Sequence, residues 1–308
     1  MHDGPIPQVL GTTIPVIANA SSGGGHSNDS LAELRKAFAD QGITAEVLTP
    51  PPGALEATLR NALGQHPPVI VAAGGDGTVS AVAAAARNTG TALAVVPFGT
   101  FNHFAKDLGI PLETNEAVRL LLEGRRVAIV LGEVNGRTFV NNASLGLYPA
   151  MVRTRDKLRR HFGHSKRRAM IWAMLAAIRR TPLMTLELET DREVVPCRSP
   201  FVFIGNNSYA MSGFDIGTRE RLDGGHLSIY TTQRCSLGGL ISLALRGLIG
   251  RLHQADDFAV AEARRLRVET PHKRLLVATD GEINVMETPL DFRIVSGALD
   301  VLVPVKKE

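Results

Sequence analysis

The stretch that most constrains the fold is Val69–Ser80, where an apolar run ends in three glycines, one carboxylate and one hydroxyl. The run is rich in β-branched residues and predicts a buried strand, and the alanine-rich segment Ala81–Ala86 after it predicts a helix. A strand, a glycine turn and a helix N-terminus present backbone N–H groups and a positive dipole end to a phosphate. Glycine also lets an anion approach the main chain closely. The stretch favours a phosphate-binding loop, and the alternative is a plain tight turn.

Asp76 is the unusual member of this stretch. A carboxylate beside a polyphosphate repels it unless a cation lies between them, so Asp76 favours a metal-bound nucleotide over a bare dinucleotide. A dinucleotide fingerprint is also incomplete, because the strand expected next, Leu93–Val96, ends without the acidic ligand for a ribose. The chain has no Gly-x-x-x-x-Gly-Lys-Ser/Thr motif, which excludes a P-loop enzyme.

Composition is typical of a soluble globular protein, with 44% hydrophobic and 21% charged residues in a chain of 308. This length allows two domains. The two cysteines, Cys197 and Cys235, form no Cys-x-x-Cys motif, and we interpret them as core thiols in a reducing compartment. No secretory signal and no uncharged apolar run of about 18 residues is evident, so we expect a protein that does not span a membrane.

Strands and helices alternate around the opening stretch. The strands are expected at residues 13–18, 43–48, 69–73 and 92–96. The helix after the first strand should be capped by Asn28, Asp29 or Ser30. This alternation predicts an α/β domain with a parallel sheet and crossover helices, in which ligands bind at the carboxyl ends of the strands. The loops at these ends should face one crevice. They are Asn19–Gly25, Thr49, Gly74–Thr78 and Gly99–Asn102.

The pattern changes after a helix expected at Glu116–Leu122. Apolar segments separated by turn residues then predict strands and few long helices, which favours a mainly antiparallel β domain. These strands are expected at residues 126–134, 138–145, 184–190, 200–205, 226–232, 264–269 and 274–279. We therefore expect an α/β domain over residues 1–125 and a β-rich domain over residues 126–308. Return of the C-terminal segment to the first domain is an alternative.

Several blocks in this order resemble the diacylglycerol kinase catalytic-domain family, in particular its bacterial soluble lipid kinases, which act on diacylglycerol, sphingosine or ceramide. The blocks are Asn19-Ala20-Ser21-Ser22-Gly23, Gly74-Gly75-Asp76-Gly77-Thr78, Pro97-Phe98-Gly99-Thr100-Phe101-Asn102-His103-Phe104-Ala105, Asn141-Asn142-Ala143-Ser144-Leu145-Gly146, Asp223-Gly224-Gly225-His226-Leu227 and Asp280-Gly281-Glu282. The resemblance implies an NAD kinase-like or phosphofructokinase-like first domain and a β-sandwich second domain. The chain departs from the family at Ala20, Phe101 and His103, where proline, a small residue and an acidic residue are common.

The resemblance further implies that ATP phosphates lie against the two glycine loops and that Asp76 is a Mg²⁺ ligand, a role that suits a hard oxygen donor. The nucleotide-binding residues implied are Asn19, Ser22, Gly23, Thr49, Gly74, Gly75, Asp76, Gly77, Thr78, Ser80, Thr100 and Asn102. For Thr78, an ordinary helix N-cap is the alternative.

By the same resemblance, Glu282 is the general base that takes the proton of a lipid hydroxyl, and Asp280 orients it or assists the metal. From the residues alone, Asp-Gly-Glu after an apolar run predicts a hairpin turn. Asp223 is similar to the structural-metal aspartate of the family, with carbonyl groups of Glu220 and Gly225 as co-ligands. A turn without metal is the alternative.

The segment Met151–Arg180 carries ten basic residues and one acidic residue, Asp156, around the apolar run Met170–Ile178. It predicts a peripheral, salt-sensitive contact with an anionic membrane surface, and a solvated basic helix over a buried face is the alternative. Aromatic residues are sparse in the segment, which argues against nucleic acid as a partner. The histidines, including His226, have no metal-ligand spacing and are expected to be solvated or locally bonded.

These observations predict a lipid kinase that depends on ATP and Mg²⁺, with a diacylglycerol-like or sphingoid lipid as acceptor. Its expected location is the cytoplasm, at the inner face of the membrane, and a homodimer is a further expectation. An NAD kinase is the alternative enzyme, and a non-catalytic, membrane-associated nucleotide-binding protein is the alternative of another class.

Overall fold

The computed structural model describes residues 3–4, 9–19, 27–51, 53–100, 102–147, 149, 183–213, 215–219, 224–232, 252–253 and 258–305. The chain divides into two units. Unit 1 is Met1–Leu131 with Val295–Glu308, and unit 2 is Gly132–Ile294. The predicted membrane-binding segment 151–180 and Cys235 lie outside the described residues. No helix in the described ranges is long and apolar enough to cross a membrane.

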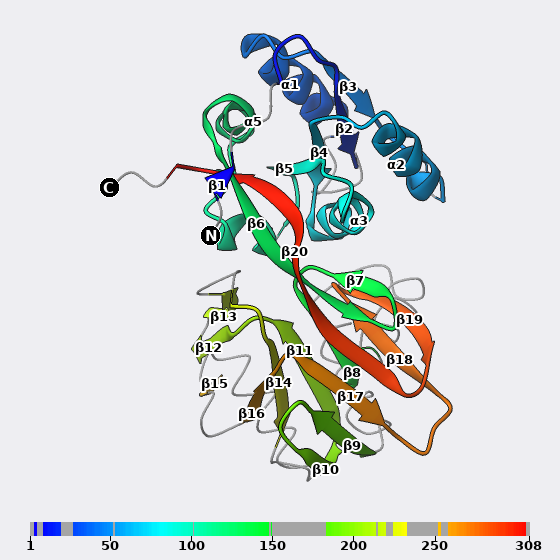
Figure 1. Ribbon diagram of the computed structural model, residues 1–308. Helices are drawn as coiled ribbons and strands as arrows, with labels where there is room; N and C mark the ends of the chain where they lie inside the picture. The colour runs from blue at the N-terminus through cyan, green and yellow to red at the C-terminus, as the bar shows by residue number, and fades with distance from the viewer. Residues whose placement is uncertain are drawn as a thin grey trace, which may run out of the picture. The chain divides into compact units, whose positions relative to one another are not determined.

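Unit 1 has the predicted parallel sheet with crossover helices. Its strands lie in the order β3 (Ala45–Leu48), β2 (Ile14–Ala18), β4 (Val69–Gly74), β5 (Ala92–Pro97), all parallel. The helices are α1 (Ser27–Asp40), α2 (Leu55–Gly64), α3 (Asp76–Ala86), α4 (His103–Asp107) and α5 (Thr114–Glu123). Helix α1 packs with α5 and α2 packs with α3, so that helices cover the sheet (Figure 1).

Burial explains why these apolar runs form this sheet. Every residue of β2, β4 and β5 is buried, as expected for parallel strands covered on both faces, whereas the edge strand β3 is half-buried. Helix α1 buries Leu34, Ala37 and Phe38 on one side. Its predicted cap is wrong, because the helix begins at Ser27 and the residues at 28–30 lie within its first turn.

Two further strands complete the sheet in unit 1. The C-terminal strand β20 (Leu290–Val303) runs parallel to β5 in this unit, with Val301 opposite Leu93. Strand β6 (Arg125–Val134) pairs with β20 and with the short strand β1 (Asp3–Gly4). Arg126 of β6 and Asp300 of β20 form a half-buried ion pair. The chain therefore returns to unit 1 at its C-terminal end.

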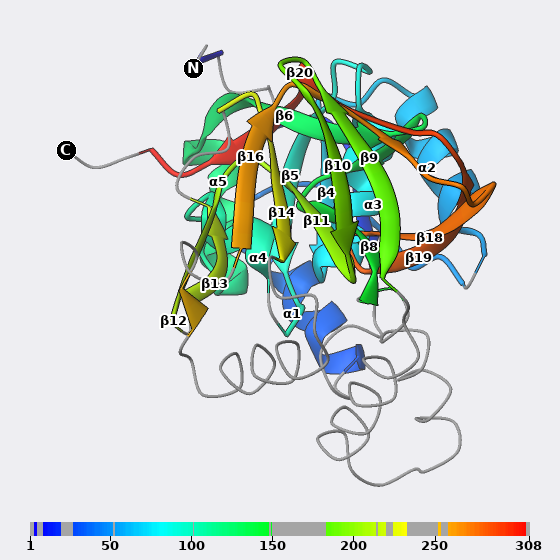
Figure 2. The ribbon, with the colours of Figure 1, turned by 90° about the horizontal axis from the view of Figure 1, so that it is seen from below.

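Unit 2 is antiparallel, as predicted. One sheet has the order β10 (Val194–Ser199), β9 (Met184–Thr190), β17 (Arg265–Glu269), β20. A second has the order β16 (Phe258–Ala263), β14 (Leu227–Thr232), β11 (Phe201–Asn206), β8 (Asn142–Gly146), β18 (Arg274–Thr279), β19 (Glu282–Glu287). The third is β13 (Asp215–Arg219), β12 (Tyr209–Gly213), β15 (Leu252–His253). Figure 2 shows β14 beside β16 and β9 beside β10.

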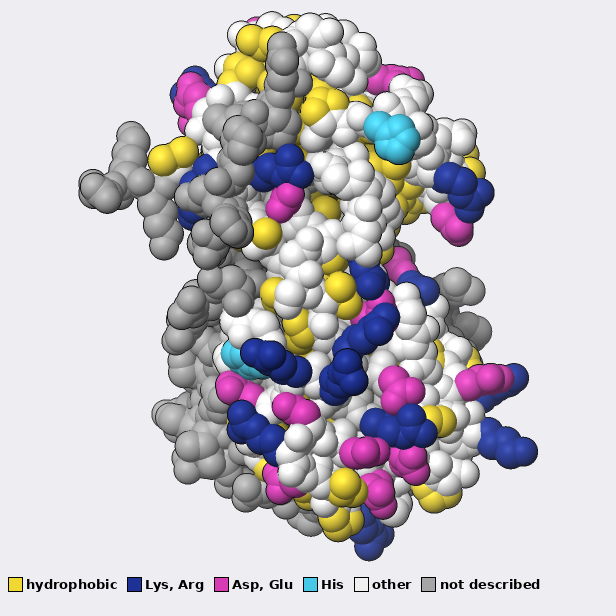
Figure 3. All heavy atoms as spheres, viewed as in Figure 1, with side chains coloured by type: hydrophobic (Ala, Val, Ile, Leu, Met, Phe, Trp, Pro, Cys, Tyr) yellow, Lys and Arg dark blue, Asp and Glu magenta, His cyan; other side chains and the backbone are white. Residues whose placement is uncertain are grey.

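One hydrophobic core lies between the first two sheets of unit 2. It joins Leu186, Leu266 and Phe292 of the first sheet with Leu145 and Ile204 of the second, among other residues. The other face of the first sheet is charged, and Figure 3 shows its basic and acidic side chains interspersed. Arg267 pairs there with Glu269 and Asp291. This alternation of buried apolar and exposed polar residues is the pattern of a sandwich strand.

A strand predicted over residues 138–145 is in fact two strands. The chain forms β7 (Arg137–Phe139), which pairs with β6, and then β8, which pairs with β11 and β18. Val140 and Asn141 separate them, and their amide groups donate to the carboxylate of Asp280 instead of to a neighbouring strand. A side chain far away in the sequence thus interrupts the predicted strand.

Candidate active site

In unit 1, the loop between β4 and α3 has the predicted strand–turn–helix form. Gly74 is the last residue of β4, and Gly75 is the N-cap of α3, in extended conformation and without a side-chain cap. Asp76 is therefore the first residue of the helix. The first amide groups of a helix lack intrahelical acceptors, and the helix dipole adds a positive field there. This end of α3 can bind a phosphate group.

The loop after β5 packs directly on this turn. A Cβ atom at Gly99 would lie 2.6 Å from the Cα atom of Gly75, so the two loops touch backbone to backbone. A Cβ atom at Gly74 would lie 2.6 Å from Oγ1 of Thr78, which is buried. Only glycine fits at these positions without displacing its neighbours.

Asn102 gives the second loop its shape. It has a left-handed conformation with φ of 50° at the N-cap of α4. Its Oδ1 accepts from the amide of Gly99 at 2.9 Å, and its Nδ2 donates to the carbonyl of Gly99 at 2.8 Å. Both ends of the side-chain amide are therefore engaged within the loop, which accounts for the asparagine in the Gly-Thr-x-Asn block.

Asp76 joins the two loops. Its Oδ1 accepts a hydrogen bond from the amide of Phe104, in the first turn of α4, at 3.2 Å. Among the described residues, Oδ2 forms no hydrogen bond or ion pair. A half-buried carboxylate with one oxygen held and the other open fits a hard cation such as Mg²⁺, which prefers oxygen ligands and keeps several waters.

The other predicted nucleotide ligands differ in position. Asn19 follows β2 and its amide donates to the carbonyl of Ala73, which places it beside the end of β4. Thr100 is exposed in the loop after β5, and Ser80 is half-buried in α3. Thr49 follows the edge strand β3 and is exposed. Ser22 and Gly23 lie outside the described residues.

In unit 2, Asp280 and Gly281 form the two-residue turn of the hairpin β18–β19. Their φ values of 48° and 86° are both positive, as in the tight turns that join antiparallel strands. Thr279 and Glu282 face each other at its base. The hairpin turn that the residues predict is therefore present, and it also places the two carboxylates of the Asp-Gly-Glu block.

Both carboxylate oxygens of Asp280 bind the backbone between β7 and β8. Oδ2 accepts from the amide of Val140 at 2.8 Å, and Oδ1 accepts from the amides of Asn141 at 2.8 Å and Asn142 at 3.1 Å. The amide of Asp280 in turn donates to the carbonyl of Asn142 at 2.9 Å. Asp280 thus fastens the hairpin to the segment that opens β8.

Glu282 is more accessible, with 63% of its side chain exposed. Its Oε2 accepts from Nη2 of Arg137 at 2.7 Å. Arg137 also donates from Nε to Oγ1 of Thr279 at 3.1 Å. Neither Arg137 nor Thr279 was a predicted site residue, because 145 and 142 positions separate Arg137 from these partners and no local pattern joins them.

Of the predicted second metal site, only Gly225 is described. Its amide donates to Oδ1 of the buried Asn207 at 2.9 Å. Glu220 and Asp223 lie outside the described residues. Within the ranges that the structure describes, no group of three or more His, Cys, Asp or Glu side chains is placed to hold a metal ion.

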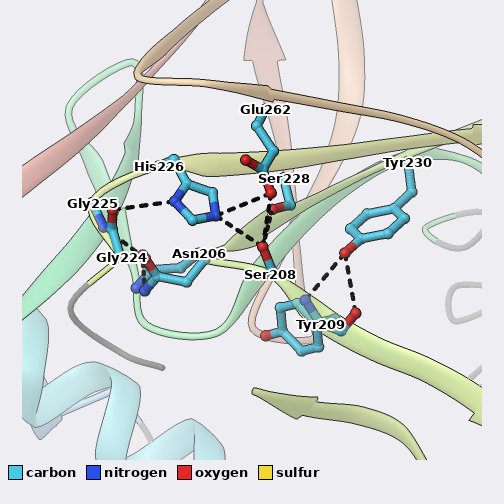
Figure 4. Close-up of polar contacts among 10 residues, drawn as sticks. Asn206, Ser208, Tyr209, Gly224, Gly225, His226, Ser228, Tyr230 and Glu262 are labelled. Atoms are coloured by element: carbon cyan, nitrogen blue, oxygen red, sulfur yellow. Dashed lines mark hydrogen bonds and ion pairs between the residues drawn. The ribbon is translucent and has the colours of Figure 1, made fainter. Parts of the chain in front are cut away.

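A polar cluster follows this turn (Figure 4). Oγ of Ser208 lies 2.9 Å from Nε2 of His226 and donates to Oε1 of Glu262 at 3.0 Å. Nδ1 of His226 lies 3.2 Å from the carbonyl of Gly224. His226 is therefore locally bonded, as predicted. Both of its ring nitrogens have partners, and the carboxylate lies on the same nitrogen as the hydroxyl, which is not the order of a hydrolase triad.

Buried tyrosines connect this region to the segment that Asp280 holds. The hydroxyl of Tyr209 donates to the carbonyl of Asn141 at 2.8 Å, and the amide of Tyr209 donates to the hydroxyl of Tyr230 at 3.1 Å. Burial is the main reason that the pKa of Tyr230 is raised. The network is a buried support beneath the Asp-Gly-Glu hairpin.

Comparisons with known proteins cover the candidate residues of each unit. The family model "Diacylglycerol kinase catalytic domain" matches residues 13–134, and the model "YegS C-terminal NAD kinase beta sandwich-like domain" matches residues 144–303. Together they cover the predicted site residues that the structure describes, and Arg137 lies between the two matches. The chain belongs to the diacylglycerol kinase family. It is a lipid kinase of this family, with an NAD kinase-like fold.

Named relatives support this assignment. A diacylglycerol kinase of Staphylococcus aureus (strain Newman) is 26% identical over 283 residues, which cover 90% of this chain and 86% of the relative. One of Staphylococcus saprophyticus is 27% identical over 226 residues, covering 71% and 72%.

Two solved structures from Bacillus anthracis str. Sterne share the fold. One, described as a diacylglycerol kinase, is 19% identical with a TM-score of 0.67 and covers 94% of this chain and 96% of that one. The other is 22% identical with a TM-score of 0.73, covering 94% and 97%.

Proposed function

We propose that this lipid kinase transfers the γ-phosphoryl group of ATP, with Mg²⁺, to a hydroxyl group of a diacylglycerol-like or sphingoid lipid. The observation that carries the proposal is the state of Asp76. Its carboxylate lies at the positive end of α3, with Oδ1 held by the amide of Phe104 and Oδ2 open among the described residues. Amide groups for a phosphate and an oxygen for a cation lie side by side, which suits a metal-bound polyphosphate better than a dinucleotide.

The protein groups on the donor side position the phosphates. The amides of Asp76 and Gly77 at the start of α3 are the phosphate ligands, because the amide of Thr78 donates to the carbonyl of Gly75 at 2.9 Å. The contact between Gly75 and Gly99 keeps the two loops close enough to act together. When bound, Mg²⁺ neutralises charge on the β- and γ-phosphates. Asp76 is the residue that would hold it, and Asn102 acts by maintaining the loop that follows.

On the acceptor side, Glu282 serves as the general base. It takes the proton from the lipid hydroxyl as that oxygen attacks the γ-phosphorus, and the bond from phosphorus to the β,γ-bridging oxygen of ATP breaks. Asp280 orients the hairpin, because its carboxylate is fully engaged with three backbone amides. Diacylglycerol is the first acceptor to test, since a relative whose match covers 90% of this chain is named for it.

Isosteric variants test these two assignments. Asp76→Asn removes the charge that a cation needs, and Glu282→Gln removes the base, and each should lower kcat by about 10²–10⁴-fold. Glu287→Gln is the matched control, because Glu287 lies on the same strand as Glu282 and its ion pair with Arg274 is largely exposed. Full turnover in a folded Asp76→Asn or Glu282→Gln protein would overturn the corresponding role.

A further inference from the structure

Arg137 lies directly after the turn between β6 and β7, and it reaches two residues of the hairpin β18–β19. Its Nε donates to Oγ1 of Thr279 at 3.1 Å, and its Nη2 contacts Oε2 of Glu282 at 2.7 Å. Thr279 and Glu282 are opposite each other at the base of that hairpin. One planar guanidinium group therefore spans the pair of residues that flank the Asp-Gly turn.

The two contacts differ in what they do. Thr279 is only 3% exposed, so its hydroxyl is a fixed anchor for Nε of Arg137. The guanidinium group is rigid, and fixing Nε also fixes the direction of the neighbouring Nη2. Glu282, in contrast, has a flexible side chain that is 63% exposed. Its Oε2 is held by Arg137, and among the described residues Oε1 forms no hydrogen bond or ion pair.

We infer that Arg137 is a positioning residue for Glu282, an inference that rests on the proposed role of Glu282 as the base. Arg137 holds one carboxylate oxygen against the hairpin and leaves the other available to accept the proton of a hydroxyl group. A glutamate without this contact samples several rotamers, and ordering it again at each turnover costs rate.

The segment 137–142 is bound to the hairpin β18–β19 at a second place. Arg137 begins β7 and binds Glu282 with its side chain, while the backbone amides at 140–142 bind the carboxylate of Asp280. The two carboxylates of the Asp-Gly-Glu block thus bind one short segment, which fixes the orientation of the hairpin relative to it.

The pair between Arg137 and Glu282 is partly exposed, with 42% and 63% of the side chains accessible. Ion pairs of this kind contribute little to the free energy of unfolding. Loss of Arg137 should therefore appear chiefly in kcat and leave the KM for ATP nearly unchanged, and any fall in thermal stability should be limited to the single hydrogen bond with the buried Thr279 hydroxyl. A purely structural residue would behave in the opposite way.

The test compares Arg137→Ala, Arg137→Lys and the matched control Arg274→Ala in the full chain, with ATP and 1,2-dioleoylglycerol in mixed micelles. Arg274 forms the corresponding pair with Glu287 at the other end of the same hairpin, at 3.0 Å. We expect Arg137→Ala to lower kcat about tenfold to thirtyfold, the range expected when one glutamate side chain must be ordered at each turnover. Arg137→Lys should retain more activity than Arg137→Ala, and Arg274→Ala should match the wild type.

A double variant separates this inference from the proposed function. If Arg137 acts through Glu282, Arg137→Ala should cause no further loss in a Glu282→Gln background. An equal loss in both backgrounds, or an Arg137→Ala protein as active as Arg274→Ala, would overturn the inference while leaving Glu282 as the base. Full activity of Glu282→Gln, or no transfer to lipid by the wild type, would instead overturn the proposed function.

Discussion

Removal of the Asp280 carboxylate should destabilise unit 2 far more than removal of an exposed carboxylate. In Asp280→Ala, the backbone amides of the buried residues Val140 and Asn141 lose the carboxylate to which they donate. The amide of the half-buried residue Asn142 also loses its hydrogen bond to Asp280. A buried group left without a partner costs about 1–3 kcal/mol, so the expected loss is about 3–6 kcal/mol. That is a large part of the usual stability of about 5–15 kcal/mol for a domain.

Urea unfolding followed by circular dichroism measures this loss as a lower midpoint at an unchanged slope. Asp280→Asn should be intermediate, because asparagine keeps one oxygen and tolerates the left-handed backbone that φ of 48° requires. Asp291→Ala is the control, since the side chain of Asp291 is 60% exposed and its carboxylate pairs with Arg267, which is 41% exposed. If Asp280→Ala and Asp291→Ala unfold at the same urea concentration, the reasoning about the Asp280 contacts is refuted.

Three further predictions concern other parts of the molecule. Gly99→Ala should destabilise unit 1 by about 1–3 kcal/mol in urea unfolding, because the added Cβ atom would meet the Cα atom of Gly75. Gly64→Ala is the control, since a Cβ atom there has nothing within 4 Å, and equal unfolding midpoints of the two variants would contradict the prediction. Burial raises the pKa of Tyr230 above its usual 10.0, so the hydroxyl loses its proton at lower pH in the unfolded chain than in the folded protein. The free energy of unfolding should therefore fall more steeply above pH 10 in the wild type than in Tyr230→Phe, and an equal slope in the two proteins would contradict the prediction. Anionic vesicles should bind the protein in a salt-sensitive way through residues 151–180, and equal binding to neutral vesicles, or none to either, would rule out the electrostatic contact.

The fold of unit 1 was largely predictable because each of its parallel strands is a short apolar run followed by a loop with proline, glycine or small polar residues. Strands β2, β4 and β5 are buried on both faces, so nothing but their hydrophobic pattern was needed. The return of the chain through β20 was harder to predict. This strand of 14 residues carries exposed polar positions and a glycine at 297 with φ of 63°. Both features are more typical of a loop than of one continuous strand.

Unit 2 shows where sequence patterns fail. Edge strand β10 contains a proline and is mostly exposed, and β19 is half-exposed, so neither has the apolar alternation of a strand in a sheet centre. The split of residues 138–145 into β7 and β8 depends on Asp280, about 140 positions away. Contacts of this range are set by the assembled sandwich and leave no local signal.

The candidate site residues also differ in how far the sequence alone could identify them. Asp76 was identifiable because a carboxylate in a glycine turn at a helix N-terminus has few structural explanations. Asp280 and Glu282 depended on the family resemblance, since the residues alone indicate a hairpin turn, which the structure does contain. Arg137 was missed because an arginine after a turn is ordinary, and only its contacts with Thr279 and Glu282 distinguish it.

The most direct test of the central claim is the transfer of label from γ-labelled radioactive ATP to a total lipid extract, with Mg²⁺ present, followed by identification of the product. The account predicts a labelled phospholipid whose acceptor is a diacylglycerol or sphingoid hydroxyl, lost in Asp76→Asn and when Mg²⁺ is removed by a chelator. Label that appears only in free phosphate, or in NADP when NAD is supplied, would contradict it.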